Sequence, residues 1–448
     1  MRGRPLPHCE GAIMKVILLM LAAAAVAAVA LLFGGVLAGS KAGGPTTMDS
    51  NAAAARLLAG FAPGDTAALV AQLEARAAAN SRDGQALVLL GLAYQQRARE
   101  TGRPSFYPRS ESVLRRALRL DSENALALSG LAALAASRHR FAEARDLARR
   151  TLAVNPYGTA AWGILGDAEI ETGHYRAAFA AFERMMTIKP TASGYARISY
   201  ARQLMGRTGP AIEAMRRAVT AASATPEPAA WAYVHLGNLF AEQGRLSAAD
   251  HEYRHALAYM PVYGPALAGL ARSESWRGRD ATAVRLWRKA LGAQAIPEHA
   301  AGLGDALWRL GREEEADQAY ADAEALETAF AANGGHNQLE TALFDLDHGQ
   351  HLTDALVRAR AGWRLRPSVE GEHVLAWALF KNRSCREARV HSVRALRLGT
   401  KDWGAMLHRS LIESSLGHEQ AATVFRERAL AVNRYALEAF GLLAAHGR

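Results

Sequence analysis

The chain has 448 residues, a formal net charge of +10 and two cysteines. Alanine and leucine dominate, and no alternating Val/Ile/Thr run predicts a β-strand, so a sheet-based fold is excluded. The arginines alternate with acidic residues, as in Arg312–Glu315, whereas nucleic-acid binders usually gather them in a basic stripe with interleaved aromatic residues. This pattern disfavours nucleic acid as a partner.

A short basic region, 1–15, precedes an apolar segment over 16–39. At about 1.5 Å per residue, a helix over 16–39 is long enough to cross a hydrocarbon core of about 30 Å. Arg2, Arg4 and Lys15 lie before it, and positive residues stay on the cytoplasmic side. We therefore expect a transmembrane helix that anchors the chain to a membrane and leaves the rest outside the cytoplasm.

A cleaved signal peptide is the alternative interpretation of the same segment. Val36, Leu37 and Ala38 offer small residues at a spacing suited to cleavage, and Met14 is an alternative start. Cleavage would give a secreted or periplasmic protein, so both interpretations place the chain outside the cytoplasm, as is typical of a bacterial envelope protein. Cys9 and Cys385 flank the segment, and we expect no disulfide between them.

The next region, 40–64, is rich in Gly, Pro, Thr and Ser near its start, which indicates a linker. A helix is expected over 65–82, with Leu69, Val70 and Leu73 along one face. It would cap the first of the repeats that fill 83–436. Residues 437–448 are expected to form a second capping helix, because the last repeat of a stack needs its open face covered.

The region 83–436 contains about ten copies of a pattern about 34 residues long. Each copy predicts two helices, and one helical pair cannot bury its own apolar face, so neighbouring pairs must stack. Gly166, Ala178 and Met185 are placed where the two helices of one pair cross, and Gly173 ends the first helix. The clearest copy, 159–192, carries Trp162, Leu165, Gly166, Gly173, Tyr175, Ala178, Phe182, Met185 and Pro190.

This pattern resembles the tetratricopeptide repeat family. Copies 125–158, 159–192 and 230–263 match best, and copies 336–369, 369–402 and 403–436 are degenerate. The copy 84–122 carries extra residues, expected in a long turn over 100–108 that contains Phe106 and Tyr107. The resemblance implies an all-α solenoid, a right-handed superhelix, whose concave groove binds other polypeptides without catalysis.

One segment, His251-Glu252-Tyr253-Arg254-His255, matches the H-E-x-x-H pattern of zinc peptidases. Two imidazoles four residues apart on a helix share a face and can bind one zinc, with Glu252 activating its water. The segment lies in the second helix of a good repeat copy, so we expect both histidines to point toward solvent. Glu274, a possible third ligand, would lie on a different surface. The peptidase remains the alternative with the weaker support, and we expect no catalytic residue, metal or cofactor.

The concave groove is the expected binding surface. One position of the first helices points into it and holds, among others, Asp167, Tyr200, Asn238, Arg272 and Asp305. A second position is small, as at Gly163, which would leave room for a bound peptide. Trp276 and Trp308 are placed at the groove edge, where tryptophans make good anchors.

Together these features predict a non-catalytic scaffold that is tethered to a membrane and binds protein or peptide segments outside the cytoplasm. Binding of an anionic polymer is a further alternative, which salt-sensitive affinity would favour.

Overall fold

The computed structural model describes residues 65–441. All regular secondary structure in this range is helical, which confirms the predicted all-α solenoid. Within 65–441, no helix has both the length and the apolar composition of a membrane span. The segment 16–39, the whole predicted linker 40–64 and residues 442–448 of the predicted C-terminal helix lie outside the described residues.

Ten helical hairpins follow one another between two single helices, α3 (Asp65–Ala79) and α24 (Ala436–Gly441). The helices of the ten hairpins are, in chain order, α4 (Gly84–Thr101) and α5 (Phe106–Leu120); α6 (Ala125–Ser137) and α7 (Phe141–Val154); α8 (Thr159–Glu171) and α9 (Tyr175–Ile188); α10 (Ala192–Leu204) and α11 (Thr208–Ala222); α12 (Pro226–Ala241) and α13 (Leu246–Tyr259); α14 (Gly264–Trp276) and α15 (Asp280–Ala293); α16 (Pro297–Arg309) and α17 (Glu313–Ala332); α18 (Gln338–Asp347) and α19 (Leu352–Leu365); α20 (Val369–Lys381) and α21 (Cys385–Ala395); α22 (Trp403–Ser415) and α23 (Glu419–Val432).

Within a hairpin, a small residue of the first helix lies under a large residue of the second, as the repeat pattern predicts. A methyl group on Gly166 would lie 2.3 Å from the ring of Phe182. The same relation holds for Gly237 and the ring of Tyr253, at 2.5 Å. Glycine therefore lets the two backbones approach closely enough for the aromatic ring to fill the space between them.

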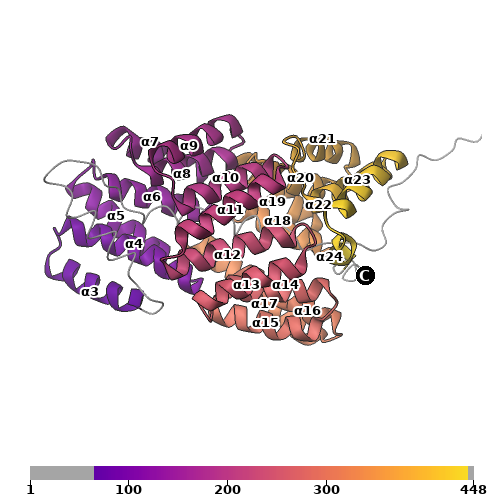
Figure 1. Ribbon diagram of the computed structural model, residues 1–448, viewed down its shortest axis with the longest axis horizontal. Coiled ribbons are helices and arrows are strands. Elements are labelled where there is room, and N and C mark those ends of the chain that lie inside the picture. The colour runs from indigo at the N-terminus through magenta and orange to yellow at the C-terminus, as the bar shows by residue number, and fades with distance from the viewer. Residues whose placement is uncertain (1–64, 442–448) are drawn as a thin grey trace, which may run out of the picture.

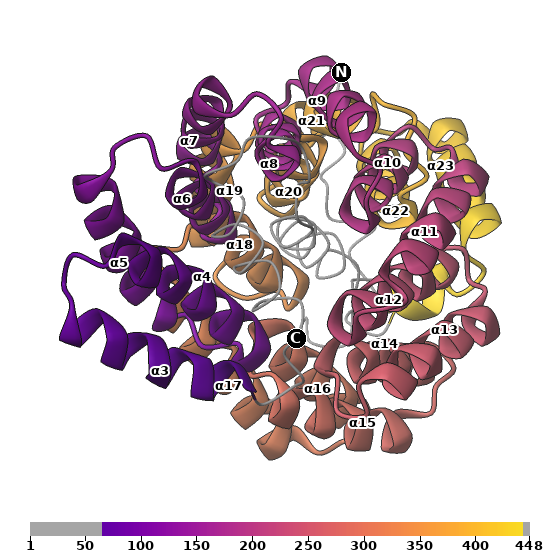
Figure 2. The ribbon, with the colours of Figure 1, turned by 60° about the vertical axis from the view of Figure 1, so that its left-hand side comes forward.

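The first helices of the hairpins line the inner side of the superhelix, and the second helices form its outer side (Figure 2). First helices of successive hairpins contact one another, as α6 does with α8 and α12 does with α14. The first helices are thus spaced more closely than the second helices, and this difference between the inner and outer layers curves the stack. Of the two single helices, α3 packs on α4, and α24 contacts α14, α22 and α23.

The superhelix is tight enough for its second turn to lie against its first (Figures 1 and 2). The connection after each of hairpins six to ten meets the interhelical turn of hairpins one to five, and we call this line of contact the seam. Its partners are 192 to 198 residues apart, a little under six periods of about 34 residues. The seam includes hydrogen bonds from Gln294 Nε2 to the Arg99 carbonyl (2.7 Å), from His336 N to the Arg138 carbonyl (2.9 Å), from Arg366 Nε to Glu171 Oε2 (3.1 Å), from Val369 N to the Tyr175 hydroxyl (2.7 Å) and from Asn433 Nδ2 to the Ala241 carbonyl (3.4 Å).

Glycines with positive φ bring the two turns into contact. Gly206 has a φ of 68°, and a methyl group there would lie 2.2 Å from the Gly399 carbonyl oxygen. Gly311 occupies the corresponding turn of a second-turn hairpin, with a φ of 71°, and a methyl group on it would meet no atom within 4 Å. At Gly206 glycine is therefore required for two reasons, the positive φ and the close approach of the Gly399 carbonyl. At Gly311 only the positive φ requires it.

The first hairpin differs from the expected long turn over 100–108. Its extra residues extend the helices, so α4 ends at Thr101 and α5 begins at Phe106. Phe106 stacks on Tyr94 with ring centroids 6.0 Å apart, and Tyr107 meets Phe330 of the second turn edge-on at 6.3 Å. Packing inside the molecule therefore accounts for both aromatic residues.

The regular stack is interrupted once within the described chain, between α17 and α18. Every other pair of successive helices from α3 to α23 packs closely, whereas these two make at most marginal backbone contact. α17 is unusually long, with 20 residues, and α18 is short, with 10. Side chains bridge one edge of the gap, where Tyr320 meets Phe344 and His348.

We expect Gly206→Ala to destabilise the protein more than Gly311→Ala. Both substitutions place alanine at positive φ, which costs roughly 1–2 kcal/mol, but only the first also forces the Gly399 carbonyl away. The overpacking adds roughly 1–3 kcal/mol. Urea unfolding followed by circular dichroism would measure the difference, and equal losses for the two variants would contradict the close contact between Gly206 and Gly399.

Candidate functional site

The polar residues predicted to line the groove mostly bond to neighbouring repeats. Asp167 accepts hydrogen bonds from Nε and Nη2 of Arg197 in the next hairpin, at 3.0 and 2.7 Å. The two side chains retain only 6% and 1% of their exposure. The Arg197 guanidinium also covers Gly163, where a methyl group would lie 2.9 Å from its Cζ. The space expected to hold a peptide is therefore occupied by arginine at this point.

Two further predicted residues, Asn238 and Arg272, belong to one network. Asn238 Oδ1 accepts hydrogen bonds from Arg272 Nη2 and from the Tyr253 hydroxyl, both at 2.8 Å. Asp305 is buried and accepts a hydrogen bond from the Tyr320 hydroxyl at 3.0 Å. Its carboxylate also lies 3.1 Å from His348 Nε2. These side chains join adjacent hairpins, because first helices on the inner side are close enough for polar groups to meet.

The expected position of Trp276 at a groove edge is wrong. Trp276 is 2% exposed and packs edge-on against Trp403 of α22, with ring centroids 6.0 Å apart. A helix four hairpins later in the chain therefore covers it, which no single repeat indicates. Trp308 is half-buried and packs against the apolar cluster formed by α14 to α17.

The histidines of the H-E-x-x-H segment lie on the outer helix α13. His251 is exposed and His255 is half-buried, with their Nε2 atoms 3.0 Å apart. The His255 ring stacks on Tyr233 at 5.1 Å, while Glu274 pairs with Arg277 at 3.0 Å. Among residues 65–441, no group of three or more His, Cys, Asp or Glu side chains is arranged to hold a metal ion.

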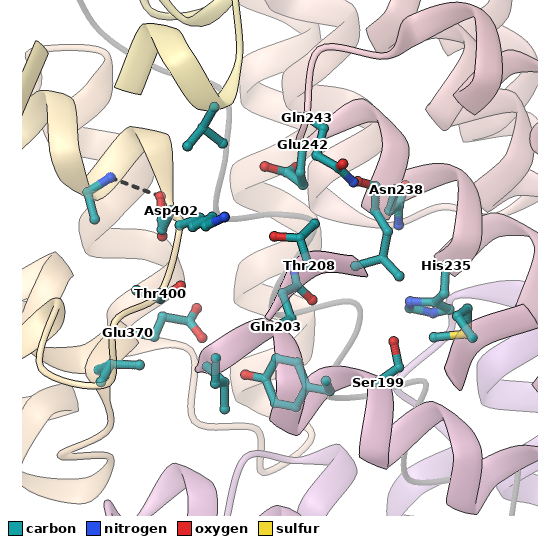
Figure 3. Close-up of a pocket in the computed structure, with 18 of the residues that line it drawn as sticks. Ser199, Gln203, Thr208, His235, Asn238, Glu242, Gln243, Glu370, Thr400 and Asp402 are labelled. Carbon is teal, nitrogen blue, oxygen red and sulfur yellow. Dashed lines mark hydrogen bonds between the residues drawn. The ribbon is translucent and has the colours of Figure 1, made fainter. Parts of the chain in front are cut away.

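Two of the predicted residues, Tyr200 and Asn238, line a cavity of about 140 Å³ between the first and second turns, here called the inter-turn cavity. Figure 3 shows its two sides. Gln203, Asn238 and Glu242 project from the first turn, and Glu370 and Asp402 face them from the second. The cavity exists because two turns of the superhelix meet.

Buried carboxylates give the inter-turn cavity an unusual charge state. Burial raises the pKa of Glu242 to about 7, although Arg272 acts in the opposite direction. Burial likewise raises the pKa of Glu370 to about 8, against the lowering effect of Arg366. Near neutral pH these groups are partly protonated, and a bound cation would favour their ionised forms.

A larger cavity of about 490 Å³ occupies the gap between α17 and α18, and we call it the wedge cavity. Of the predicted residues it includes Asp305. Its other acidic lining residues are Glu298, Glu324, Glu327, Glu340, Asp345, Asp347, Asp354 and Glu370, beside the basic or titratable residues Arg358, His348 and His351. Burial raises the pKa of Glu298 to about 7 and that of Glu327 to about 8. The interior of this basic protein is thus locally acidic.

These acidic residues were not predicted from the sequence. Glu298 and Glu370 lie in the first turns of their helices, where carboxylates are ordinarily explained by the favourable end of the helix dipole. Glu327 lies in a second helix beyond the usual length of the repeat. Only the contact between turns and the gap after α17 bring them together, and neither feature has a signature within one period.

No protein-family model and no curated protein matches the chain. Among solved structures, the chain is similar to PilW, a widely conserved type IV pilus biogenesis factor, with 19% identity over 45% of this chain and 92% of PilW and a TM-score of 0.38. A human IFIT1 dimer with PPP-AAAA is 15% identical over 78% of this chain and 72% of its own, with a TM-score of 0.40. MamA is 20% identical over 38% of this chain and 97% of its own, with a TM-score of 0.30. Likeness at this level supports no inference about function.

We expect the protein to be more stable at pH 6.5 than at pH 8.5. Glu298 and Glu327 have folded pKa values above the ordinary value of 4.5, so their contribution is present at low pH and is lost as the pH rises through about 7 to 8. The loss between the two pH values is on the order of 1 kcal/mol for each carboxylate. Buried His139 and His299 have folded pKa values near 4 and act in the opposite direction, because at pH 6.5 each imidazole takes up about half a proton on unfolding. This offsets only ~0.4 kcal/mol per histidine between the two pH values, less than the effect of a carboxylate.

Thermal unfolding at the two pH values would measure the effect. The variant Glu298→Gln/Glu327→Gln should show a smaller decrease in melting temperature between pH 6.5 and 8.5, because the amides do not titrate. An identical decrease in the variant and the parent would contradict the assignment of these two carboxylates.

Proposed function

We propose that the protein is a non-catalytic scaffold that binds peptide or protein segments on the inner side of its superhelix. The observation that carries this proposal is the inter-turn cavity, where Tyr200 and Asn238 meet Glu370 and Asp402 of the second turn. Ligand sites typically combine apolar walls with a few polar groups, and this cavity has both. An extended segment can reach such groups from several hairpins at once.

The acidic side chains on the inner side favour a polypeptide over an anionic polymer as the ligand. Glu242, Glu298, Glu327 and Glu370 line the cavities, so an anionic polymer bound there would meet like charge. The peptidase alternative gains no support from His251 and His255, which lie on the outer layer beside one another. A polypeptide remains the ligand class that the chain suits best.

We further propose that the apolar segment 16–39 tethers the scaffold to a membrane with its repeats outside the cytoplasm. The support is the sequence alone: its length, its apolar composition and the basic residues that precede it. A tether would hold a concave binding surface next to the membrane without taking part in binding.

Site-specific photo-crosslinking tests the binding surface. Benzoylphenylalanine placed at Gln203, which lines the inter-turn cavity, should crosslink to a polypeptide in living cells. The same group at Tyr157, which is 69% exposed and lines none of the cavities described above, is the control. Products that appear equally at both positions, or at Tyr157 alone, would contradict binding on the inner side.

Membrane extraction tests the tether. We expect the full-length protein to stay in the membrane fraction after washing with alkaline carbonate, because a spanning helix is held by the hydrocarbon core. A variant that lacks residues 16–39 should be released. Release of the intact full-length chain by carbonate would exclude the anchor, and a shortened mature chain would indicate cleavage.

A further inference from the structure

The wedge cavity is a break in an otherwise continuous stack. The backbones of α17 and α18 make at most marginal contact, and the space between them measures about 490 Å³. Ligand pockets usually measure about 300–1,000 Å³. Glu324, Thr328 and Asp354 of the lining are exposed, so the wedge cavity reaches the molecular surface.

Two buried acceptors in the wedge cavity, Glu340 Oε2 and Asp347 Oδ2, lack a hydrogen-bond partner. Asp347 is 1% exposed, and its Oδ1 accepts a hydrogen bond from Trp377 Nε1 at 3.1 Å. Its Oδ2 is buried and has no hydrogen-bond partner. A buried carboxylate oxygen left unsatisfied is costly, so an oxygen in this state at a cavity wall indicates a missing donor.

The acidic lining exceeds the positive charge available to it. Arg358 pairs with Asp345, and Arg366 pairs with Glu340. Glu298, Glu324, Glu327 and Asp354 form no ion pair within residues 65–441, and Glu327 contacts only the amide of Asn337. Acidic side chains outnumber basic ones in the lining, so a cationic group between α17 and α18 would be attracted to the ionised forms of these carboxylates and would favour their ionisation.

The spacing of the carboxylates favours an organic cation. They are not clustered as a metal site requires, since residues 65–441 contain no group of three or more ligating side chains suited to a metal ion. A guanidinium presents five N–H donors and can bond to separate carboxylates at once. Pro297, Leu343 and Val374 also line the wedge cavity and offer apolar contact to the stem of such a side chain.

We propose that the wedge cavity binds a basic segment of a partner polypeptide, with an arginine or lysine side chain inserted between α17 and α18. This inference rests on the proposed function, since it names the chemistry of the segment that the scaffold binds. The inserted cation joins two walls that the chain itself leaves apart.

The test selects peptides from a random library on the full-length protein in detergent and measures binding of the selected peptides by fluorescence anisotropy. The expected peptides are rich in arginine or lysine. Their affinity should fall by about tenfold or more in Glu298→Gln/Glu327→Gln, because two charge-assisted partners are lost. Glu183→Gln/Glu427→Gln removes two exposed carboxylates elsewhere on the surface and should leave affinity unchanged.

A second variant, Thr328→Trp, places an indole at the exposed mouth of the wedge cavity and should also weaken binding, with circular dichroism confirming that the helices are retained. Selection of peptides without basic residues would overturn the inference, as would equal affinity of basic peptides for both double variants. Spermidine that binds as tightly as the peptides would identify a small polyamine as the ligand and overturn the peptide assignment.

The outcomes also separate this inference from the proposed function. Crosslinking at Gln203 without selection of any basic peptide would overturn the wedge cavity as a site and leave the scaffold intact. Loss of both signals would contradict the scaffold itself.

Discussion

Contact between successive turns is the constraint on which the rest of the structure depends, and Arg366 lies at its centre. Its guanidinium pairs with Glu171 of the first turn at 3.1 Å and with Glu340 of α18, and it lies over the ring of Phe141 at 5.3 Å. Both Arg366 and Glu171 are 3% exposed. Burial of such a pair is favourable only when its geometry and surrounding hydrogen bonds are good, which ties the position of the second turn closely to that of the first.

The same contact explains the unusual charge states inside the protein. In an open solenoid, carboxylates on first helices would face water and titrate normally. Burial alone would raise the pKa of Glu340, but Arg366 holds it below its usual range. Glu242 and Glu370 face the opposite turn across the inter-turn cavity. No positive charge lies as close to them as Arg366 lies to Glu340, so the effect of burial dominates and their pKa values rise. Closure of the superhelix thus gives these carboxylates pKa values that they would not have in an open stack.

The features that could be predicted from the sequence are those that depend on contacts within a single repeat. The hairpins, their small crossing residues such as Gly166 and the terminating Gly173 all follow from contacts within about 34 residues, and the structure agrees with them. The polar residues Asp167 and Asn238 of the first helices, predicted to line the groove, bond to the adjacent hairpin. The sequence does not distinguish a polar side chain that bonds to the adjacent hairpin from one that is available to bind a ligand.

The features that could not be predicted depend on contacts between repeats that are far apart in the sequence. Trp276 occupies a position that would be a groove edge in an isolated stack, and Trp403, more than a hundred residues later, buries it. Gly206 and Gly311 are indistinguishable within their repeats, yet only Gly206 meets the opposite turn. The superhelical pitch determines which residues meet a distant repeat. It is the sum of small rotations between successive hairpins, and no single residue encodes it.

The gap between α17 and α18 shows how these two kinds of contact combine. A solenoid ordinarily depends on each repeat packing against its neighbours, so a break would separate the chain into two independent stacks. Here the hairpin after the break is held from another direction, because His336 bonds to Arg138 and Arg366 bonds to Glu171 of the first turn. The seam therefore replaces the missing packing between neighbours. It allows an acidic, water-accessible cavity to exist in the middle of the stack, where repeat packing alone would have closed it with apolar side chains.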